Sequence, residues 1–136
     1  MRVLILTLIL LVPLSSSSFA MNAGDLYKYC KPFADRAFNA EKNDDLLCLM
    51  YFRGVADSGF NLCSKMKSAI STVGEESPLA PGLRAVQDFE GLAKQGDNMH
   101  PAIQSFVNEI STKPEKWGFL PIQYVHSALK KLSPCK

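Results

Sequence analysis

The chain has 136 residues, of which 47% are hydrophobic and 21% are charged, and its formal net charge is +2. This length corresponds to one domain and is sufficient for a hydrophobic core. The small net charge argues against a nucleic-acid-binding protein, because such proteins carry a basic patch or stripe. The densest basic cluster, Lys130 and Lys131, is interpreted as favourable charge at the end of a helix.

The first twenty residues have the pattern of a secretory signal peptide. Arg2 supplies the positive start, residues 3–14 are a nearly unbroken apolar run, and Ser18-Phe19-Ala20 is a cleavage site of the small-x-small type. The apolar run is too short to cross a bilayer, which takes about 20 residues. We therefore expect cleavage near Ala20 and a mature chain without a membrane anchor, carrying 14 basic and 13 acidic residues.

Helical periods dominate the first half of the mature chain, and no segment alternates in the manner of a β-strand. Apolar residues from Leu26 to Phe33 recur at spacings of three and four, which predicts a helix that Pro32 interrupts near Lys31. A second helix is predicted from Asp44 to about Ser58, with Gly59 as its stop. Its inward face is expected to comprise Leu47, Met50, Tyr51, Gly54 and Val55. Because a mid-helix glycine costs about 1 kcal/mol, Gly54 predicts the close approach of another backbone.

The segment from Ser64 to Asn98 is the least regular part of the sequence. Residues 73–81 have loop composition, with Gly74, Pro78 and Pro81 among them. Apolar residues at intervals of three predict a helix from Leu83 to Lys94.

The C-terminal third is the most regular part. A helix is predicted from Pro101, with an apolar face formed by Ile103, Phe106, Val107 and Ile110. Trp117 and Phe119 are expected to form an apolar corner. A last helix is predicted from Pro121 to Ser133, with Ile122, Val125, Leu129 and Leu132 inward.

All four cysteines follow the leader, so an exported chain can form two disulfides. The cysteines are Cys30, Cys48, Cys63 and Cys135. Four cysteines allow three pairings, and the sequence alone does not choose among them. The expected helix order favours Cys30–Cys48, between neighbouring antiparallel helices, together with Cys63–Cys135, which both follow helices. A metal site is disfavoured because no CxxC motif and no histidine at ligand spacing accompany them. The expected fold is an all-α, disulfide-linked bundle of four to five helices.

The residues do not favour an enzyme, a metal site or a cofactor. There is no HExxH, no GxSxG and no glycine-rich phosphate loop. His100 is interpreted as a capping or surface residue and His126 as a partly exposed helix residue. Asp44-Asp45 is interpreted as a helix start, since neighbouring helix positions do not face each other.

Two stretches resemble one known family. Residues 48–57, Cys-Leu-Met-Tyr-Phe-Arg-Gly-Val-Ala-Asp, resemble the Cys-Leu-x-Gly-Tyr-x-x-Gly-Val-x-Asp helix of the type VI secretion amidase immunity proteins (the Rap/Tai family of resistance-associated proteins). Residues 106–135 follow the end of the same family in order and spacing, up to Pro134-Cys135. Cys30 and Cys63 match the family's first and third cysteines. The resemblance covers residues 24–63 and 99–135.

The chain departs from the family pattern in two places. The family usually has Gly-Tyr where this chain has Met50, Tyr51 and Phe52. It also joins its third cysteine to the next helix by a short loop, whereas this chain inserts about 25 residues there. The expected organisation is therefore a signal peptide at 1–20 and a domain at 21–136 with an inserted segment at about 64–98.

The resemblance implies a periplasmic, all-helical protein, often a homodimer, that neutralises a peptidoglycan-cleaving amidase by occluding its active-site groove with protruding loops. Since loops on a rigid scaffold commonly carry recognition, the inserted loop is the expected recognition element. The predicted contact residues are Phe60, Glu75, Glu76, Leu79 and Trp117. A solvated surface remains the alternative for Glu75-Glu76, and a core position the alternative for Trp117.

A second function remains open beside inhibition. Small secreted helical proteins with two disulfides can enclose an apolar cavity, so the chain can alternatively be a carrier of a small hydrophobic ligand. A structural envelope protein that only self-associates is a third interpretation.

Overall fold

The computed structural model describes residues 21–39, 42–92 and 98–135, and the predicted signal peptide lies outside these ranges. The described residues form five α-helices and one short 3-10 helix, with one isolated β-bridge between Leu92 and Pro134. The elements are α1 (Ala23–Asp35), α2 (Asn43–Val73), α3 (Ala80–Glu90), α4 (His100–Ser111), η1 (Pro114–Lys116) and α5 (Pro121–Leu132). The predicted all-α class is confirmed.

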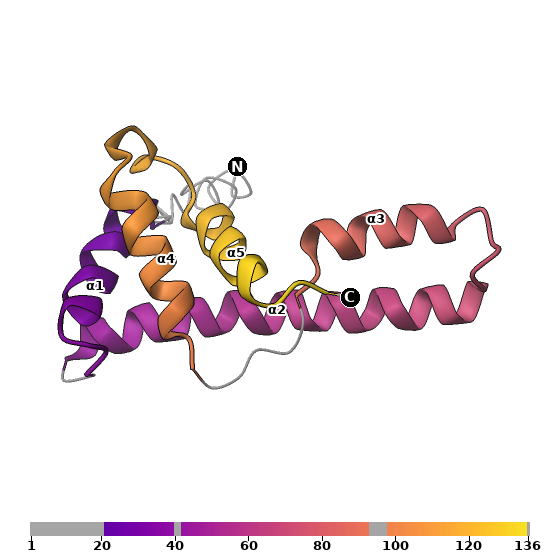
Figure 1. Cartoon of the computed structure of the whole chain (residues 1–136), viewed down its shortest axis with the longest axis horizontal. Coiled ribbons are helices and arrows are strands. Elements are labelled where there is room, and N and C mark those ends of the chain that lie inside the picture. The colour runs from indigo at the N-terminus through magenta and orange to yellow at the C-terminus, as the bar shows by residue number, and fades with distance from the viewer. Residues whose placement is uncertain (1–20, 40–41, 93–97, 136) are drawn as a thin grey trace, which may run out of the picture.

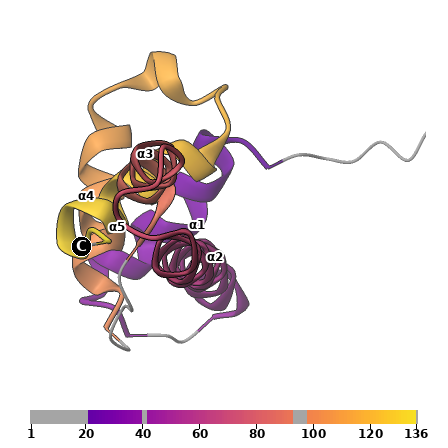
Figure 2. The same cartoon turned by 90° about the vertical axis from the view of Figure 1, so that its right-hand side faces the viewer.

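Helix α2 organises the molecule. Its 31 residues correspond to a length of about 46 Å. Figure 1 shows α1, α4 and α5 gathered over its N-terminal half, while α3 lies alongside its C-terminal half. In the end-on view of Figure 2, α2 and α3 run side by side. The chain thus has a body of four helices and a two-helix extension.

The hydrophobic core lies in the body. Helices α1, α2, α4 and α5 meet there, and the rings of Phe52 and Phe106 pack edge to face with centroids 5.7 Å apart. The largest fully buried apolar side chains are Phe33, Phe52, Phe106, Leu26, Leu92, Ile103, Ile110, Leu129 and Val125. The predicted faces of α4 and α5 account for much of this core. However, Ile122 and Leu132 of α5, which were expected inward, are 50% and 48% exposed.

Helix α1 runs through Pro32 and ends at Asp35, so the predicted interruption near Lys31 is wrong. Proline removes one amide donor, but the helix has only three residues left after it. The amide of Arg36 still donates to the Pro32 carbonyl at 3.3 Å. The buried Phe33 and Ala34 give the last turn a packing partner.

Helix α2 is longer than predicted, and its buried face differs from the predicted one. It continues fourteen residues beyond Gly59 and ends at Gly74, which has a positive φ of 87°. Its buried residues are Asp45, Cys48, Phe52, Ala56, Gly59, Cys63 and Ile70. Leu47 and Met50 are instead 45% and 70% exposed. The face is rotated because Asp45 and Cys48 turn inward to partners on α1 and the segment that follows it.

The region expected to be irregular is largely helical. The loop between α2 and α3 covers only residues 74–79, and α3 starts at Ala80 rather than Leu83. Pro81 falls in the first turn of α3, where its missing donor costs nothing. The helix ends at Glu90, with Gly91 following as its C-cap, while the predicted end at Lys94 lies outside the described residues.

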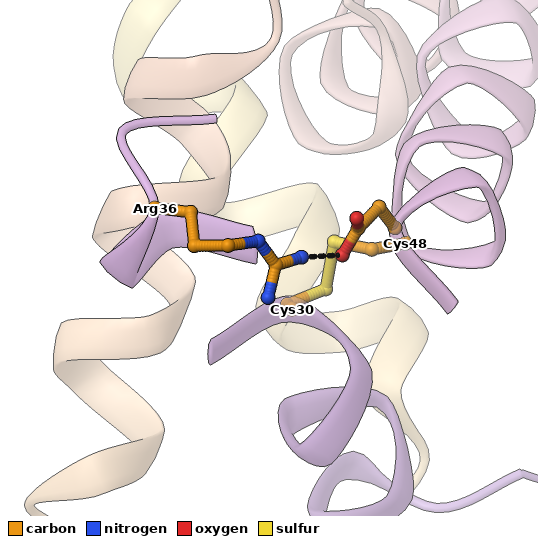
Figure 3. The surroundings of a disulfide bond; sticks show 4 residues. Cys30, Arg36 and Cys48 are labelled. Atoms are coloured by element: carbon orange, nitrogen blue, oxygen red, sulfur yellow. Dashed lines mark hydrogen bonds and ion pairs between the residues drawn. A yellow bond between two sulfur atoms is a disulfide. The ribbon is translucent and has the colours of Figure 1, made fainter. Parts of the chain in front are cut away.

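Two disulfides join distant elements, and their pairing is the one that the helix order favoured. Cys30 of α1 bonds to Cys48 of α2, and Cys63 of α2 bonds to Cys135 after α5. All four cysteines are used. Figure 3 shows the first bridge, with the guanidinium of Arg36 directed toward α2.

Candidate functional site

The most distinctive surface feature is the two-helix extension, formed by residues 59–92 and called the arm below. It consists of the second half of α2, the connection at 74–79 and α3. Figure 1 shows this hairpin extending away from α1, α4 and α5. A protruding, hydrogen-bonded element of this kind can reach into a concave surface on another molecule.

The base of the arm is fastened at three points. The amide of Leu92 donates to the Gly59 carbonyl at 3.1 Å, and Leu92 bridges to Pro134. A Cβ at Gly59 would lie 2.6 Å from Leu92 Cγ, so only glycine permits this approach. The Cys63–Cys135 disulfide crosses the same region. The sequence prediction placed the close approach at Gly54, but a Cβ there would meet nothing within 4 Å.

The tip of the arm is an ordered turn. The Gly74 amide donates to the Ile70 carbonyl at 2.9 Å, and the Ser77 amide to the Gly74 carbonyl at 3.1 Å. The Ala80 amide then donates to the Ser77 carbonyl at 3.0 Å. Ile70 and Ala80 are buried and join the two helices beneath the turn. The tip therefore presents its exposed side chains from a fixed backbone.

Those exposed side chains include three of the five predicted contact residues. Leu79 is 64% exposed. Glu76 is exposed, and Glu75 pairs with Arg84 of α3 across the surface. Glu75, Glu76 and Leu79 are close in sequence, and the structure places them together at the tip of the arm.

The other two predicted contact residues lie elsewhere. Phe60 is 38% exposed and sits near the base of the arm, about 21 Å along α2 from Gly74. Trp117 follows η1, in the loop that precedes α5. The five residues therefore do not form one surface.

Trp117 has the contacts of a packing residue. Its ring lies 5.6 Å from that of Tyr27, and its Nε1 donates to the Ile110 carbonyl at 3.1 Å. A Cβ at Gly24 would lie 2.9 Å from Trp117 Cβ, which shows how closely α1 approaches. Trp117 joins the loop to α1 and α4, although 37% of it remains exposed. Its neighbour Phe119 is 57% exposed, so the expected apolar corner is only half covered.

Sequence reasoning missed three surface features. One is an exposed apolar patch at the start of α2, formed by Leu46, Leu47 and Met50. The second is a cavity of about 570 Å³ between the two arm helices, lined by Lys67, Ile70, Ser71, Gly74, Glu75, Arg84, Gln87 and Asp88. The third is a groove of about 700 Å³ between α2 and α5. No sequence signal marked either hollow, because each combines residues from two helices.

Two ionic clusters stabilise the body. Asp45 is 1% exposed and accepts from Arg36 Nη2 at 2.5 Å and from the Lys42 amide at 2.9 Å, so it both pairs a charge and caps α2. Glu109 lies within 3.8 Å of Lys113, Lys116 and Lys131. Partial burial acts to raise the pKa of Glu109, but the hydrogen bond from Lys116 and the lysine charges outweigh it and leave the pKa below 4.5.

The two histidines lie apart in the fold. The ring of His100 stacks on Phe38 with centroids 4.2 Å apart, and His126 lines the groove between α2 and α5. Within the described ranges, no group of three or more His, Cys, Asp or Glu residues is placed to hold a metal ion.

Comparison of the chain with protein-family models, with curated proteins and with solved structures finds no match. Among the helices that the structure describes, none combines the length and apolar character needed to cross a membrane.

Proposed function

We propose that this protein is a periplasmic immunity protein that binds a peptidoglycan-cleaving amidase of type VI secretion and occludes its active site with the tip of the arm. The observation that carries the proposal is the arm itself, an ordered hairpin fastened at its base, with an exposed leucine and two carboxylates at its tip.

The resemblance to the Rap/Tai family supports this proposal in a specific way. The resembling stretches, 48–57 and 106–135, lie mostly in α2, α4 and α5, which build the body. The inserted segment at about 64–98 corresponds closely to the arm. In this proposal the body is the scaffold common to the family, and the arm is the recognition element particular to this chain.

The geometry suits an inhibitor that acts by insertion. Because the tip backbone is held by its own hydrogen bonds, little conformational entropy is lost when it docks. Leu79 supplies an apolar anchor, while Glu76 can pair with a cation at the rim of the enzyme groove. Fully covered anchors of this kind provide most of the affinity in protein interfaces.

The proposed location rests on the cysteines and the leader. Two disulfides that use every cysteine are typical of an oxidising compartment. Residues 1–20 provide the export signal in this proposal. The proposal also includes the homodimer that the resemblance implies, which sedimentation of the mature protein tests, since a purely monomeric mass would contradict it.

The test uses the amidase encoded beside this gene and purified mature protein. We expect a stable complex and loss of peptidoglycan cleavage. A tip variant that combines Glu76→Lys with Leu79→Asp should bind at least tenfold more weakly. A matched control, Glu115→Lys with Leu132→Asp, changes the same residue types away from the tip of the arm and should inhibit normally.

Two results would contradict the proposal. One is the absence of any complex with such an amidase. The other is equal inhibition by the tip variant and its control, which would place the contact surface elsewhere.

A further inference from the structure

The groove between α2 and α5 has the composition of a site for a small amphipathic molecule. Its larger apolar lining residues are Val55 and Leu62 of α2 and Ile122 of α5. Its volume of about 700 Å³ falls within the range of small-molecule sites. This surface lies where the body meets the base of the arm, since Gly59 and Leu62 belong to residues 59–92, and it does not include the tip of the arm.

The spacing of these residues explains why the two helices leave a groove. Val55 and Leu62 stand seven residues apart, which is two turns on one face of α2. Ile122 and Lys130 are eight residues apart on α5, so the groove extends about 12 Å along that helix. Gly59 contributes no side chain between Val55 and Leu62, and its buried face is turned to Leu92. The groove therefore follows the two helices for about two turns.

Among the residues that line the groove, the charged side chain is a cation. Lys130 is a cation at the end opposite Ile122, and His126 lies between them. The remaining polar lining consists of neutral hydrogen-bonding groups, such as Ser127 and Gln123. None of the lining residues carries a carboxylate. An apolar trough that ends at a cation complements a molecule with an alkyl chain and an anionic head.

We infer that the α2–α5 groove binds a single-chain amphipathic carboxylate of the fatty-acid class, with its chain over Val55, Leu62 and Ile122 and its head at Lys130. This site gives the alternative carrier function a specific location. It lies apart from the tip of the arm, where amidase binding is proposed, so either can fail without the other.

The hydrophobic contribution to binding can be measured by comparing fatty acids whose alkyl chains differ in length. Each fully buried methylene strengthens binding about fourfold, and a half-covered one about twofold. Because the groove is open to solvent along its length, we expect the half-covered value. Dodecanoate should therefore bind about fourfold more tightly than decanoate, which is two methylenes shorter.

The experiment is an NMR titration of the mature, oxidised protein with dodecanoate below its micelle concentration. We expect saturable shifts of the amides in residues 55–62 and 122–130. Ile122→Glu should weaken binding at least tenfold and Lys130→Gln about fivefold. Two controls on the same helix, Leu132→Glu and Lys131→Gln, should bind like the wild type. Dodecyltrimethylammonium, with the same chain and the opposite head, should bind at least fivefold more weakly than dodecanoate.

Three outcomes would overturn the inference. They are the absence of saturable binding, shifts spread over the whole surface, and equal weakening by the groove variants and their controls. Ile122 is half exposed, so the Ile122→Glu protein is expected to fold, and its circular dichroism spectrum verifies this before the titration.

Discussion

Two glycines of α2 provide a direct test of how the arm is joined to the body. Gly54 and Gly59 are both inside the helix, but a Cβ would meet nothing within 4 Å at Gly54 and would lie 2.6 Å from Leu92 Cγ at Gly59. Replacement by alanine removes the same backbone freedom at both positions, which is worth about 1 kcal/mol of helix stability. Gly54→Ala should therefore stabilise the protein by about 1 kcal/mol.

At Gly59 the same gain is opposed by overpacking. Leu92 is fully buried and its amide is bonded to the Gly59 carbonyl, so its side chain cannot move aside without shifting its backbone. Overpacking of this kind costs about 1–3 kcal/mol. Gly59→Ala should thus leave stability unchanged or reduce it by up to about 2 kcal/mol.

Because the gain in helix stability is the same in both variants, the difference between their free energies of unfolding measures the contact between Gly59 and Leu92. Urea unfolding of the mature, oxidised proteins, followed by circular dichroism, measures both free energies. The expected difference is about 1–3 kcal/mol in favour of Gly54→Ala. Equal stabilisation by both substitutions would refute the close packing of Gly59 on Leu92.

Three further predictions concern the body and its bridges. Asp45→Asn should lower the free energy of unfolding in urea by about 2–3 kcal/mol, because it leaves the Arg36 charge unpaired. Asp44→Asn, at the exposed neighbouring position, should lower it by under about 0.5 kcal/mol, and equal costs would contradict the buried pair. The pKa of Glu109 lies below 4.5, so its ionised form stabilises the fold above pH 4.5, and this contribution is lost as the pH falls through the folded-state pKa. Glu109→Gln should therefore cost about 1 kcal/mol at neutral pH and progressively less as the pH is lowered below 4.5, and a cost independent of pH would count against it. Removing the Cys63–Cys135 bridge, which spans 72 residues, should cost about 4 kcal/mol of stability by loop entropy. Removing the Cys30–Cys48 bridge, which spans 18 residues, should cost about 3 kcal/mol, and calorimetry that ranks the two bridges in reverse would contradict the simple loop model.

The sequence predicted the fold class and the C-terminal helices because these features depend on local signals. Pro101 and Pro121 each fall in the first turn of a helix, and the residues after them have strong amphipathic periods. The favoured disulfide pairing also followed from helix order. The fold class and the helices need no knowledge of how distant segments meet.

The inward face of α2 could not be predicted in the same way. Hydrophobicity alone places Leu47 and Met50 inside, yet the buried face contains Asp45 and Cys48. Asp45 can be buried only because Arg36 and the Lys42 amide satisfy its oxygens. Gly59 was similarly predicted to end the helix. In the structure it allows the side chain of Leu92, 33 positions later, to pack closely against α2. Partners from elsewhere in the fold decided each case.

The candidate site shows the same division. Glu75, Glu76 and Leu79 come together because they share one short turn, which sequence reasoning could identify. Phe60 lies about 21 Å along α2 from that turn, and Trp117 is held elsewhere by its packing against Tyr27 of α1. The α2–α5 groove went unnoticed because its walls, residues 55–62 and 122–130, are distant in sequence.

The most direct test of the proposed function is survival of cells that express a peptidoglycan-cleaving amidase of type VI secretion in their periplasm. Co-expression of the full-length chain, residues 1–136, should restore growth. The Glu76→Lys, Leu79→Asp variant should fail to protect at equal periplasmic abundance, while the Glu115→Lys, Leu132→Asp control should protect fully. Protection by both variants, or by neither the wild type nor the control, would contradict inhibition through the tip of the arm.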